Sequence, residues 1–332
     1  MKNFLKLLST FLLMICVIIG LDGCGNETKK EAGANGKMTV IYTNADGEAQ
    51  LAIRAALDEN GFRGKYRLQT FGTAELGAKL SAEGRHIEAD VVQMTSYYLD
   101  SVQKKHRMFI DLPEVGKPLK PHAAFYLPTI ANCGALFVNT QELHRLGLPM
   151  PKSIRDLSEP QYEGHISVSD IMTSSTAWLM TQAALNQYGE AEGAAIMRKI
   201  EHNAAAHLER AGAGPLKRIR NGEAAAGFGL RHQAVADKSK GLPIDFIDPA
   251  EGNFMLTEAV AVVDKGAQEN EQAKKIAGCI AQNARPELLK IYPVPLYAGE
   301  KVRAENQPAA LKTFKETLTV DLLQRHQKLI KQ

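Results

Sequence analysis

Short apolar strands and amphipathic helices alternate from residue 38 onward, and this alternation restricts the possible folds. Between residues 38 and 105 we predict strands at residues 38–42, 66–71 and 89–94 and helices at residues 48–60, 74–82 and 97–105. Strands that alternate with helices are typical of a mainly parallel sheet covered by helices. We therefore predict an α/β fold.

The later residues continue the alternation. Here we predict strands at residues 130–139, 166–168, 224–230, 244–247 and 256–263, and helices at residues 140–146, 178–185, 190–203, 215–221, 271–284 and 307–331. The length of 332 residues allows one large or two medium domains. No internal repeat at solenoid spacing is present.

Hydroxyl side chains fill the junction between the strand at 166–168 and the helix that follows it. They are Thr173, Ser174, Ser175 and Thr176. Ser174 or Ser175 is a suitable N-cap, because a hydroxyl oxygen accepts from a first-turn N–H. Free N–H groups and the positive helix end also favour an anion there. The junction is therefore either an anion site or only the cap of a buried helix.

Polar residues also follow two of the strands in the first part of the body. Thr43 and Asn44 follow the first strand, and Thr95, Ser96 and Tyr97 follow the third. Ligands of open α/β sheets bind outside the carboxyl ends of strands, so these residues are candidates for a binding site. Helix capping is the alternative role of the hydroxyl and amide side chains.

The N-terminal residues have the features of an export signal. Two lysines precede an apolar core that is too short for a well-flanked membrane span, so we predict a signal peptide at residues 1–23. The end Leu21-Asp22-Gly23-Cys24 resembles a bacterial lipobox, although Asp22 is an unusual occupant. We predict lipidation of Cys24 and a tether at residues 24–37. Ordinary cleavage beside an incidental cysteine is the alternative.

Composition and motifs exclude several classes of function. The net charge is +3 and no long basic block occurs, which argues against a nucleic-acid partner. The chain lacks the hydrolase elbow, the zinc-protease motif, the phosphate-binding loop and a Cys-x-x-Cys pair, so we predict no enzyme, no metal and no cofactor. Cys133 and Cys279 either pair or remain as two free buried thiols. Trp178 is expected on the core face of its helix.

Several segments, in this order, resemble the extracellular solute-binding proteins of bacterial ABC importers. They are Gly134-Ala-Leu-Phe-Val-Asn-Thr140, Pro151-Lys-Ser-Ile-Arg-Asp-Leu157, Tyr162-Glu-Gly164, Thr173-Ser-Ser-Thr176, Asn221-Gly-Glu-Ala-Ala-Ala-Gly227 and Pro249-Ala-Glu-Gly252. The resemblance is to the branch of iron(III), phosphonate and sugar-phosphate binders.

This resemblance implies a type II periplasmic-binding-protein fold with a ligand cleft between two α/β lobes. We expect crossovers near Ile130 and Val260, with lobe 1 at residues 38–129 and 261–332 and lobe 2 at residues 130–260. It also implies an exported, lipid-anchored monomer that delivers a small solute to the permease of an ABC importer.

The resemblance leaves the ligand to be argued from side chains. Iron(III) binders of this branch carry a tyrosine pair in a loop that here has Arg231 and His232. A guanidinium repels iron but forks onto a phosphonate or phosphate, although a surface salt bridge is the alternative role of Arg231. His232 is expected to be structural or at the rim. Glu251, with Glu258 and Asp170 behind it, is the expected carboxylate opposite the anion.

We therefore predict a small anionic solute, a phosphonate such as 2-aminoethylphosphonate. A sugar phosphate is the first alternative, followed by iron(III) or a polyamine on the same fold.

Overall fold

The computed structural model describes residues 38–332. The predicted signal peptide, Cys24 and the tether lie outside the described residues. The strands are β1 Thr39–Thr43, β2 Tyr66–Thr70, β3 Val91–Thr95, β4 Tyr126–Asn139, β5 Ile166–Ser169, β6 Leu208–Glu209, β7 Ala226–Leu230, β8 Ile244–Ile247, β9 Asn253–Val262 and β10 Leu311–Lys312. The helices are α1 Gly47–Leu57, α2 Thr73–Glu83, α3 Ser96–His106, α4 Thr140–Leu146, α5 Ser175–Ala204, α6 Gly214–Arg220, α7 Arg231–Ser239, α8 Ala267–Gln282, α9 Arg285–Ile291 and α10 Val320–Lys331.

The strands form one sheet in the order β2-β1-β3-β9-β4-β7-β5-β6, with β8 on β4 and β10 on β9. β1 pairs in parallel with β2 and β3, and β5 pairs in parallel with β7 and β6. The strands β4 and β9, however, are antiparallel to their neighbours β3, β7 and β8 and to each other. The sheet is therefore mixed, not mainly parallel as the alternation suggested.

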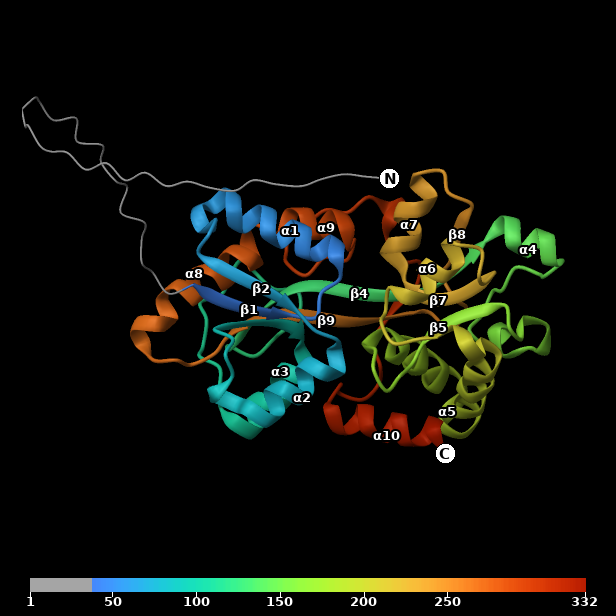
Figure 1. The fold of residues 1–332 in the computed structure, drawn as a ribbon, viewed down its shortest axis with the longest axis horizontal. Coiled ribbons are helices and arrows are strands. Elements are labelled where there is room, and N and C mark those ends of the chain that lie inside the picture. The colour runs from blue at the N-terminus through green and yellow to red at the C-terminus, as the bar shows by residue number, and fades with distance from the viewer. Residues whose placement is uncertain (1–37) are drawn as a thin grey trace, which may run out of the picture. The chain divides into compact units, whose positions relative to one another are not determined.

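Two long strands connect two groups of elements (Figure 1). β4 pairs with β9 from Tyr126 to Cys133, and from Gly134 onward it pairs with β7. β9 in turn reaches β3 through its last residues. The α/β class and the two-lobe arrangement are confirmed, with β4 and β9 as connecting strands. The residue bounds of the two lobes stay predictions.

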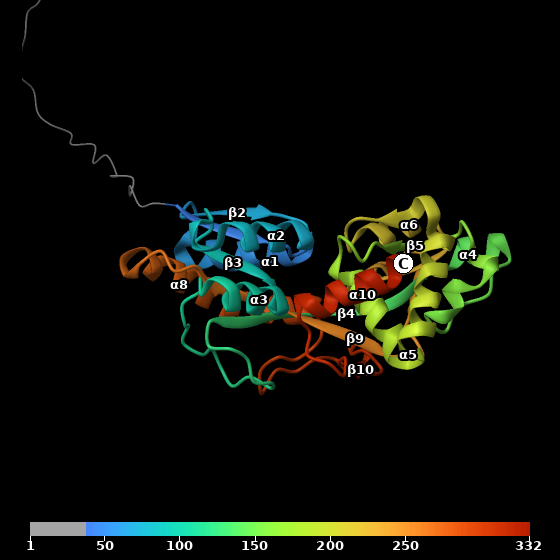
Figure 2. The same cartoon turned by 90° about the horizontal axis from the view of Figure 1, so that it is seen from below.

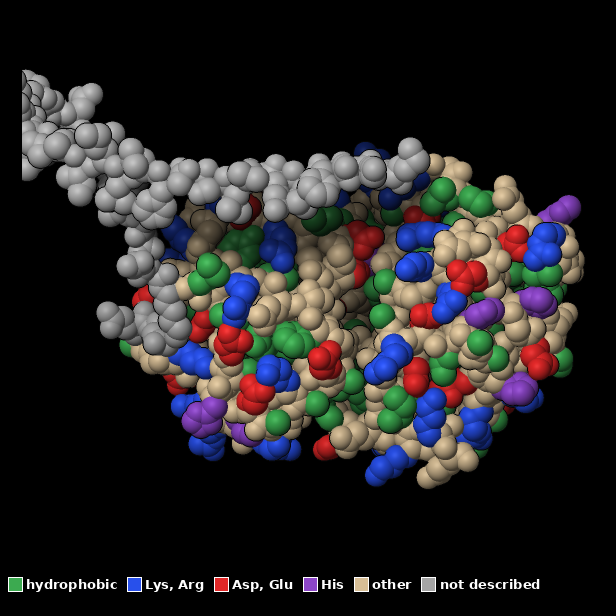
Figure 3. Space-filling view, viewed as in Figure 1, with side chains coloured by type: hydrophobic (Ala, Val, Ile, Leu, Met, Phe, Trp, Pro, Cys, Tyr) green, Lys and Arg blue, Asp and Glu red, His purple; other side chains and the backbone are tan. Residues whose placement is uncertain are grey.

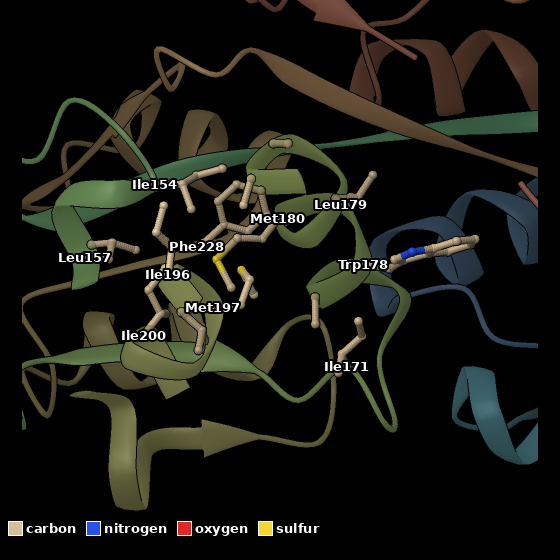
Figure 4. Packing of buried hydrophobic residues seen from close by; sticks show 14 of the residues in the cluster. Ile154, Leu157, Ile171, Trp178, Leu179, Met180, Ile196, Met197, Ile200 and Phe228 are labelled. Carbon is tan, nitrogen blue, oxygen red and sulfur yellow. The ribbon is translucent and has the colours of Figure 1, made fainter. Parts of the chain in front are cut away.

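The core of the second group of elements forms around α5, a helix of 30 residues that is interrupted at Gly189. Gly189 has a φ of 79°, which favours glycine, so the two predicted helices meet there. Apolar side chains of α5 pack against Phe228 and Ile154 (Figure 4). Trp178 is fully buried, as predicted.

The C-terminal region differs from the sequence prediction. The expected helix at 307–331 starts only at Val320, where Thr319 accepts a hydrogen bond from the N–H of Leu322 (3.1 Å). Instead, β10 adds to β9, and the helix α9 was not predicted. Helix α10 packs against α5 (Figure 2), and Nε1 of Trp178 donates to Nδ1 of His326 at 2.9 Å. Within residues 38–332, none of the helices combines the length and the apolar character that crossing a bilayer requires.

Candidate functional site

A cavity of about 390 Å³ opens between the two groups of elements. Figure 3 shows the surface hollowed there. One wall comes from the turns after β1 and β2 and from the start of α2. The other wall comes from the start of α5 and from the loop 210–213. The cavity therefore has the position that the family resemblance implied for a ligand.

The four predicted hydroxyl residues before and at the start of α5 all line this cavity. Ser174 caps the helix, since its Oγ accepts from the N–H of Thr176 at 3.2 Å. Thr173 instead donates to the carbonyl of Arg210 at 2.9 Å, which ties the loop to the helix start. Ser175 and Thr176 line the cavity as well. Capping and cavity lining thus occur together in one segment.

Loop 210–213 brings a cation that we did not predict. Arg210 is exposed, lines the cavity and forms no ion pair within residues 38–332. Gly212 allows the loop to approach the hydroxyl groups, because a Cβ on this residue would lie 2.2 Å from Oγ1 of Thr176. The glycine-rich segment 210–214 before the Pro215 helix start was the available sequence signal.

Carboxylate and amide groups from other elements also line the cavity. Glu258 on β9 is 3% exposed and accepts from Nε2 of Gln93 and Nδ2 of Asn132, both at 2.8 Å. Burial raises the pKa of Glu258 to about 7, although these two donors act in the opposite direction. Asn44 donates to Oγ1 of Thr73 at 2.9 Å. The side-chain oxygens of Asn44 and Asn132 have no hydrogen-bond partner within the described residues.

Asp46, which lines the cavity, contacts His232. Nε2 of His232 lies 3.2 Å from Oδ2 of Asp46, whose Oδ1 accepts from the N–H of Ala49 and from the phenol of Tyr292. Burial alone would raise the pKa of Asp46, but the imidazole, the phenol and the N–H together hold that pKa below its usual value. Glu48 completes a group whose ligand atoms lie within 4.8 Å of one another. This group has the donor set for a cation, but both Asp46 oxygens are already engaged, so we assign it to the contact between lobes.

Arg231 does not line this cavity, which corrects the sequence prediction. The residue is 3% exposed, and its Nε donates to Oδ1 of Asp248 at 2.7 Å. Its terminal nitrogens donate to the carbonyls of Asn306 (2.6 Å) and Gln307 (3.0 Å). Every nitrogen of the guanidinium is therefore occupied, and Arg231 fastens the segment before β10 to α7.

Glu251 does not line the cavity either, which corrects a second prediction. The side chain is fully buried and accepts from the backbone N–H groups of Ile154 (2.9 Å) and Arg155 (3.2 Å). Its Oε1 also accepts from the phenol of Tyr188 at 2.7 Å. Glu251 is thus a structural carboxylate that caps a turn.

The remaining predicted residues are either buried or lie in a separate cavity. Thr43 is fully buried and donates to the amide oxygen of Gln93. Thr95 is fully buried as well, and Tyr97 packs edge-on against Trp178 with ring centroids 4.9 Å apart. Ser96 lines a separate cavity next to Tyr126. Among the predicted residues that follow β1 and β3, only Asn44 lines the cavity between the lobes.

Both cysteines within the described residues are free and buried. Cys133 lies on β4, and Cys279 lies on α8. The alternative of two free thiols is therefore correct, and no disulfide joins the lobes within residues 38–332.

Comparison with known proteins gives a family and several relatives. Residues 82–316 match the model of the family described as bacterial extracellular solute-binding protein. An uncharacterised protein of Haemophilus influenzae is 24% identical over 276 residues, which cover 79% of this chain and 78% of the relative.

Two further comparisons involve proteins with a stated ligand. The spermidine/putrescine-binding periplasmic protein of Escherichia coli is 25% identical over 244 residues, 64% of this chain and 65% of the relative, just under two thirds of its length. The periplasmic binding protein AfuA from Actinobacillus pleuropneumoniae, solved with exogenous fructose-6-phosphate, superposes with a TM-score of 0.69. It shares 20% identity, and the match covers 89% of this chain and 97% of AfuA. The structural likeness supports the fold and does not select a ligand.

Proposed function

Because this chain belongs to the bacterial extracellular solute-binding proteins, we propose that it captures a small phosphorus-containing anion for the permease of an ABC importer. A phosphonate such as 2-aminoethylphosphonate is the leading candidate, and a sugar phosphate is the alternative. The family is one of exported binding proteins, and delivery of a small solute to a permease follows from membership.

One observation carries this proposal. The start of α5, with Ser175 and Thr176, and the exposed residue Arg210 all line the same cavity. A helix start favours an anion by about 0.3–1 kcal/mol, and each charge-assisted hydrogen bond adds about 1.5–3 kcal/mol. A tetrahedral phosphonyl or phosphoryl group has three oxygens to accept from these donors. Arg210 thereby takes the place that sequence reasoning gave to Arg231.

A polyamine is the second candidate, because the Escherichia coli relative carries a polyamine name and Asp46, Glu75 and Glu258 line the cavity. Arg210 opposes this candidate, since it places a positive charge in the same cavity. Trp178 is buried in the core and does not line the cavity, where Phe71 is the aromatic residue among the described lining. Iron(III) is disfavoured as well, because no tyrosine occurs among the described residues that line the cavity.

We also propose lipidation at Cys24 and a monomeric binding protein, with lobe 1 at residues 38–129 and 261–332 and lobe 2 at residues 130–260. The motif at Leu21 to Cys24 and the family support these proposals.

Thermal-shift screening of the purified protein with phosphonates, phosphate esters, polyamines and ferric citrate tests which ligand it binds. A ligand at 100 times its Kd adds about 2.7 kcal/mol of stability. We expect the largest shift with a phosphonate or a phosphate ester. A shift with polyamines alone contradicts the proposal.

A further inference from the structure

A fixed chain of hydrogen bonds surrounds Glu258 at the cavity floor. The N–H of Ala45 donates to Oγ1 of Thr43 at 3.0 Å, and this hydroxyl donates to the side-chain oxygen of Gln93. The Gln93 amide must therefore present its NH₂ group to Glu258, at 2.8 Å. Asn132 likewise presents its NH₂ group to Glu258. Both amides are thus held with their donors on the carboxylate.

Two amide oxygens on residues that line the cavity have no donor among the described residues. The NH₂ group of Asn132 faces Glu258, so its oxygen is left without a partner among the described residues. The NH₂ group of Asn44 donates to Thr73, and its oxygen is unpaired there as well. We call Asn44, Asn132 and Glu258 the acceptor pocket; all three line the cavity between the lobes. Because buried acceptors without donors are costly, a fitting ligand supplies several donors here.

We infer that the acceptor pocket receives an ammonium group at the end of the ligand opposite its phosphonyl or phosphoryl group, and that Glu258 selects for this charge. The inference rests on the proposed function, which places the anionic end at α5 and Arg210. An ammonium group offers three donors and a positive charge. A sugar hydroxyl offers one donor and brings an additional acceptor to a wall that already has too many.

The charged groups around Glu258 agree with a cationic ligand group. Asp46 adds a second carboxylate on the same side, and Tyr97 and Tyr292 contribute neutral phenols. His232 lies beyond Asp46, in contact with it. Arg210 belongs to the opposite wall, with α5. The cavity is therefore dipolar, which matches a zwitterion better than a simple anion.

Ammonium binding also has a proton signature. Burial raises the pKa of Glu258 to about 7, so part of the free protein carries the protonated acid at neutral pH. An ammonium beside the carboxylate favours its charged form, and binding then releases a proton. A ligand that lacks the ammonium gives no such release from Glu258.

The test compares two ligands of equal shape, 2-aminoethylphosphonate and propylphosphonate, in which a methyl replaces the ammonium. Calorimetry at pH 7 in two buffers of different ionisation enthalpy measures affinity and proton release. We expect the amine ligand to bind about ten- to a hundredfold more tightly, with proton release. In Glu258→Gln this preference should fall to a few-fold. Glu287→Gln, a matched change at an exposed carboxylate of α9 outside the cavity, should keep the preference.

The possible outcomes separate this inference from the proposed function. Equal affinity of wild-type protein for both phosphonates overturns the ammonium inference and leaves the anion site intact, without any need for a variant. Tighter binding of a hexose phosphate than of 2-aminoethylphosphonate also overturns it, because the pocket then receives hydroxyls. If no phosphonate or phosphate ester binds, the proposed function and the inference fail together. A preference that survives Glu258→Gln removes Glu258 as the selecting residue.

Discussion

His232 on α7 and Asp46 before α1 lie 3.2 Å apart, between Nε2 and Oδ2, and this contact joins the two lobes. The imidazole also packs on the ring of Tyr292, with ring centroids 4.2 Å apart. Since Asp46 caps α1 and lines the cavity, this contact joins α7 directly to the lining of the cavity.

Removing the imidazole should shift the free protein toward a more open arrangement. For His232→Ala we expect a larger radius of gyration without ligand in small-angle scattering. The loss of about 1 kcal/mol of contact should weaken ligand binding about fivefold. His144→Ala, an exposed change on α4, is the control. An unchanged radius of gyration and affinity in His232→Ala contradict a role in closure.

Glu258 should make the protein less stable as the pH rises. Its folded-state pKa of about 7 lies above the ordinary value of 4.5, so the folded protein binds the extra proton between these values. Stability is therefore fully present below pH 4.5 and decreases through pH 7, by about 3 kcal/mol. Glu258→Gln should consequently raise the free energy of unfolding at pH 8 and leave it nearly unchanged at pH 4.5. Urea titrations at both pH values measure this, and equal effects at both would exclude the titration of Glu258 as the cause.

His326 should make the protein sensitive to acid. The residue is fully buried and accepts from the indole of Trp178, and burial lowers its pKa from 6.5 to about 4. The unfolded chain then binds more protons between pH 6.5 and pH 4, so stability decreases as the pH falls through this window, by up to about 3 kcal/mol. His326→Gln should lower stability at pH 7 but flatten this dependence. An equally steep decrease in the variant, followed by thermal unfolding, argues against His326 as its source.

Much of the fold was predictable because it depends on local patterns. The strands at β5 and β8 and the helix α4 follow directly from apolar runs and caps. The start of helix α10 was predicted too early. Residues 311–312 pair with β9 instead, and Thr319 caps the helix, so the helix begins at Val320. Strand pairing depends on residues that are distant in the sequence.

The candidate site was predictable only in part, for a related reason. Ser174 and its neighbours line the cavity, and this position could be predicted because it depends on a local strand-to-helix junction. Arg231 and Arg210 cannot be distinguished by sequence, since only tertiary structure pairs Arg231 with Asp248 and leaves Arg210 without an ion pair among the described residues. A carboxylate opposite the anion was expected, but the choice of Glu251 was wrong because its partners, such as Ile154, lie far away in sequence.

Lipidation of Cys24 predicts where the protein is found after export. Cys24→Ser should release the protein from membranes, because it removes the sulfur to which the proposed lipid anchor attaches. Fractionation of cells that express each form, followed by immunoblotting, measures the change. Cys133→Ser, which alters a buried thiol, is the matched control and should remain with the membrane. An unchanged distribution of Cys24→Ser argues against the anchor.

The most direct test of the anion site compares two arginines by calorimetry with 2-aminoethylphosphonate, or with the best phosphorus-containing ligand from the screen. Arg210→Ala should lower the affinity about ten- to a hundredfold, since it removes a charge-assisted bond, and should leave stability within about 0.5 kcal/mol. Arg231→Ala should instead cost about 3–5 kcal/mol of stability, because Asp248 loses its buried countercharge. Its folded fraction should bind with nearly normal affinity. Unchanged affinity in Arg210→Ala, together with lost affinity in folded Arg231→Ala, would contradict an anion site built on Arg210 and the start of α5.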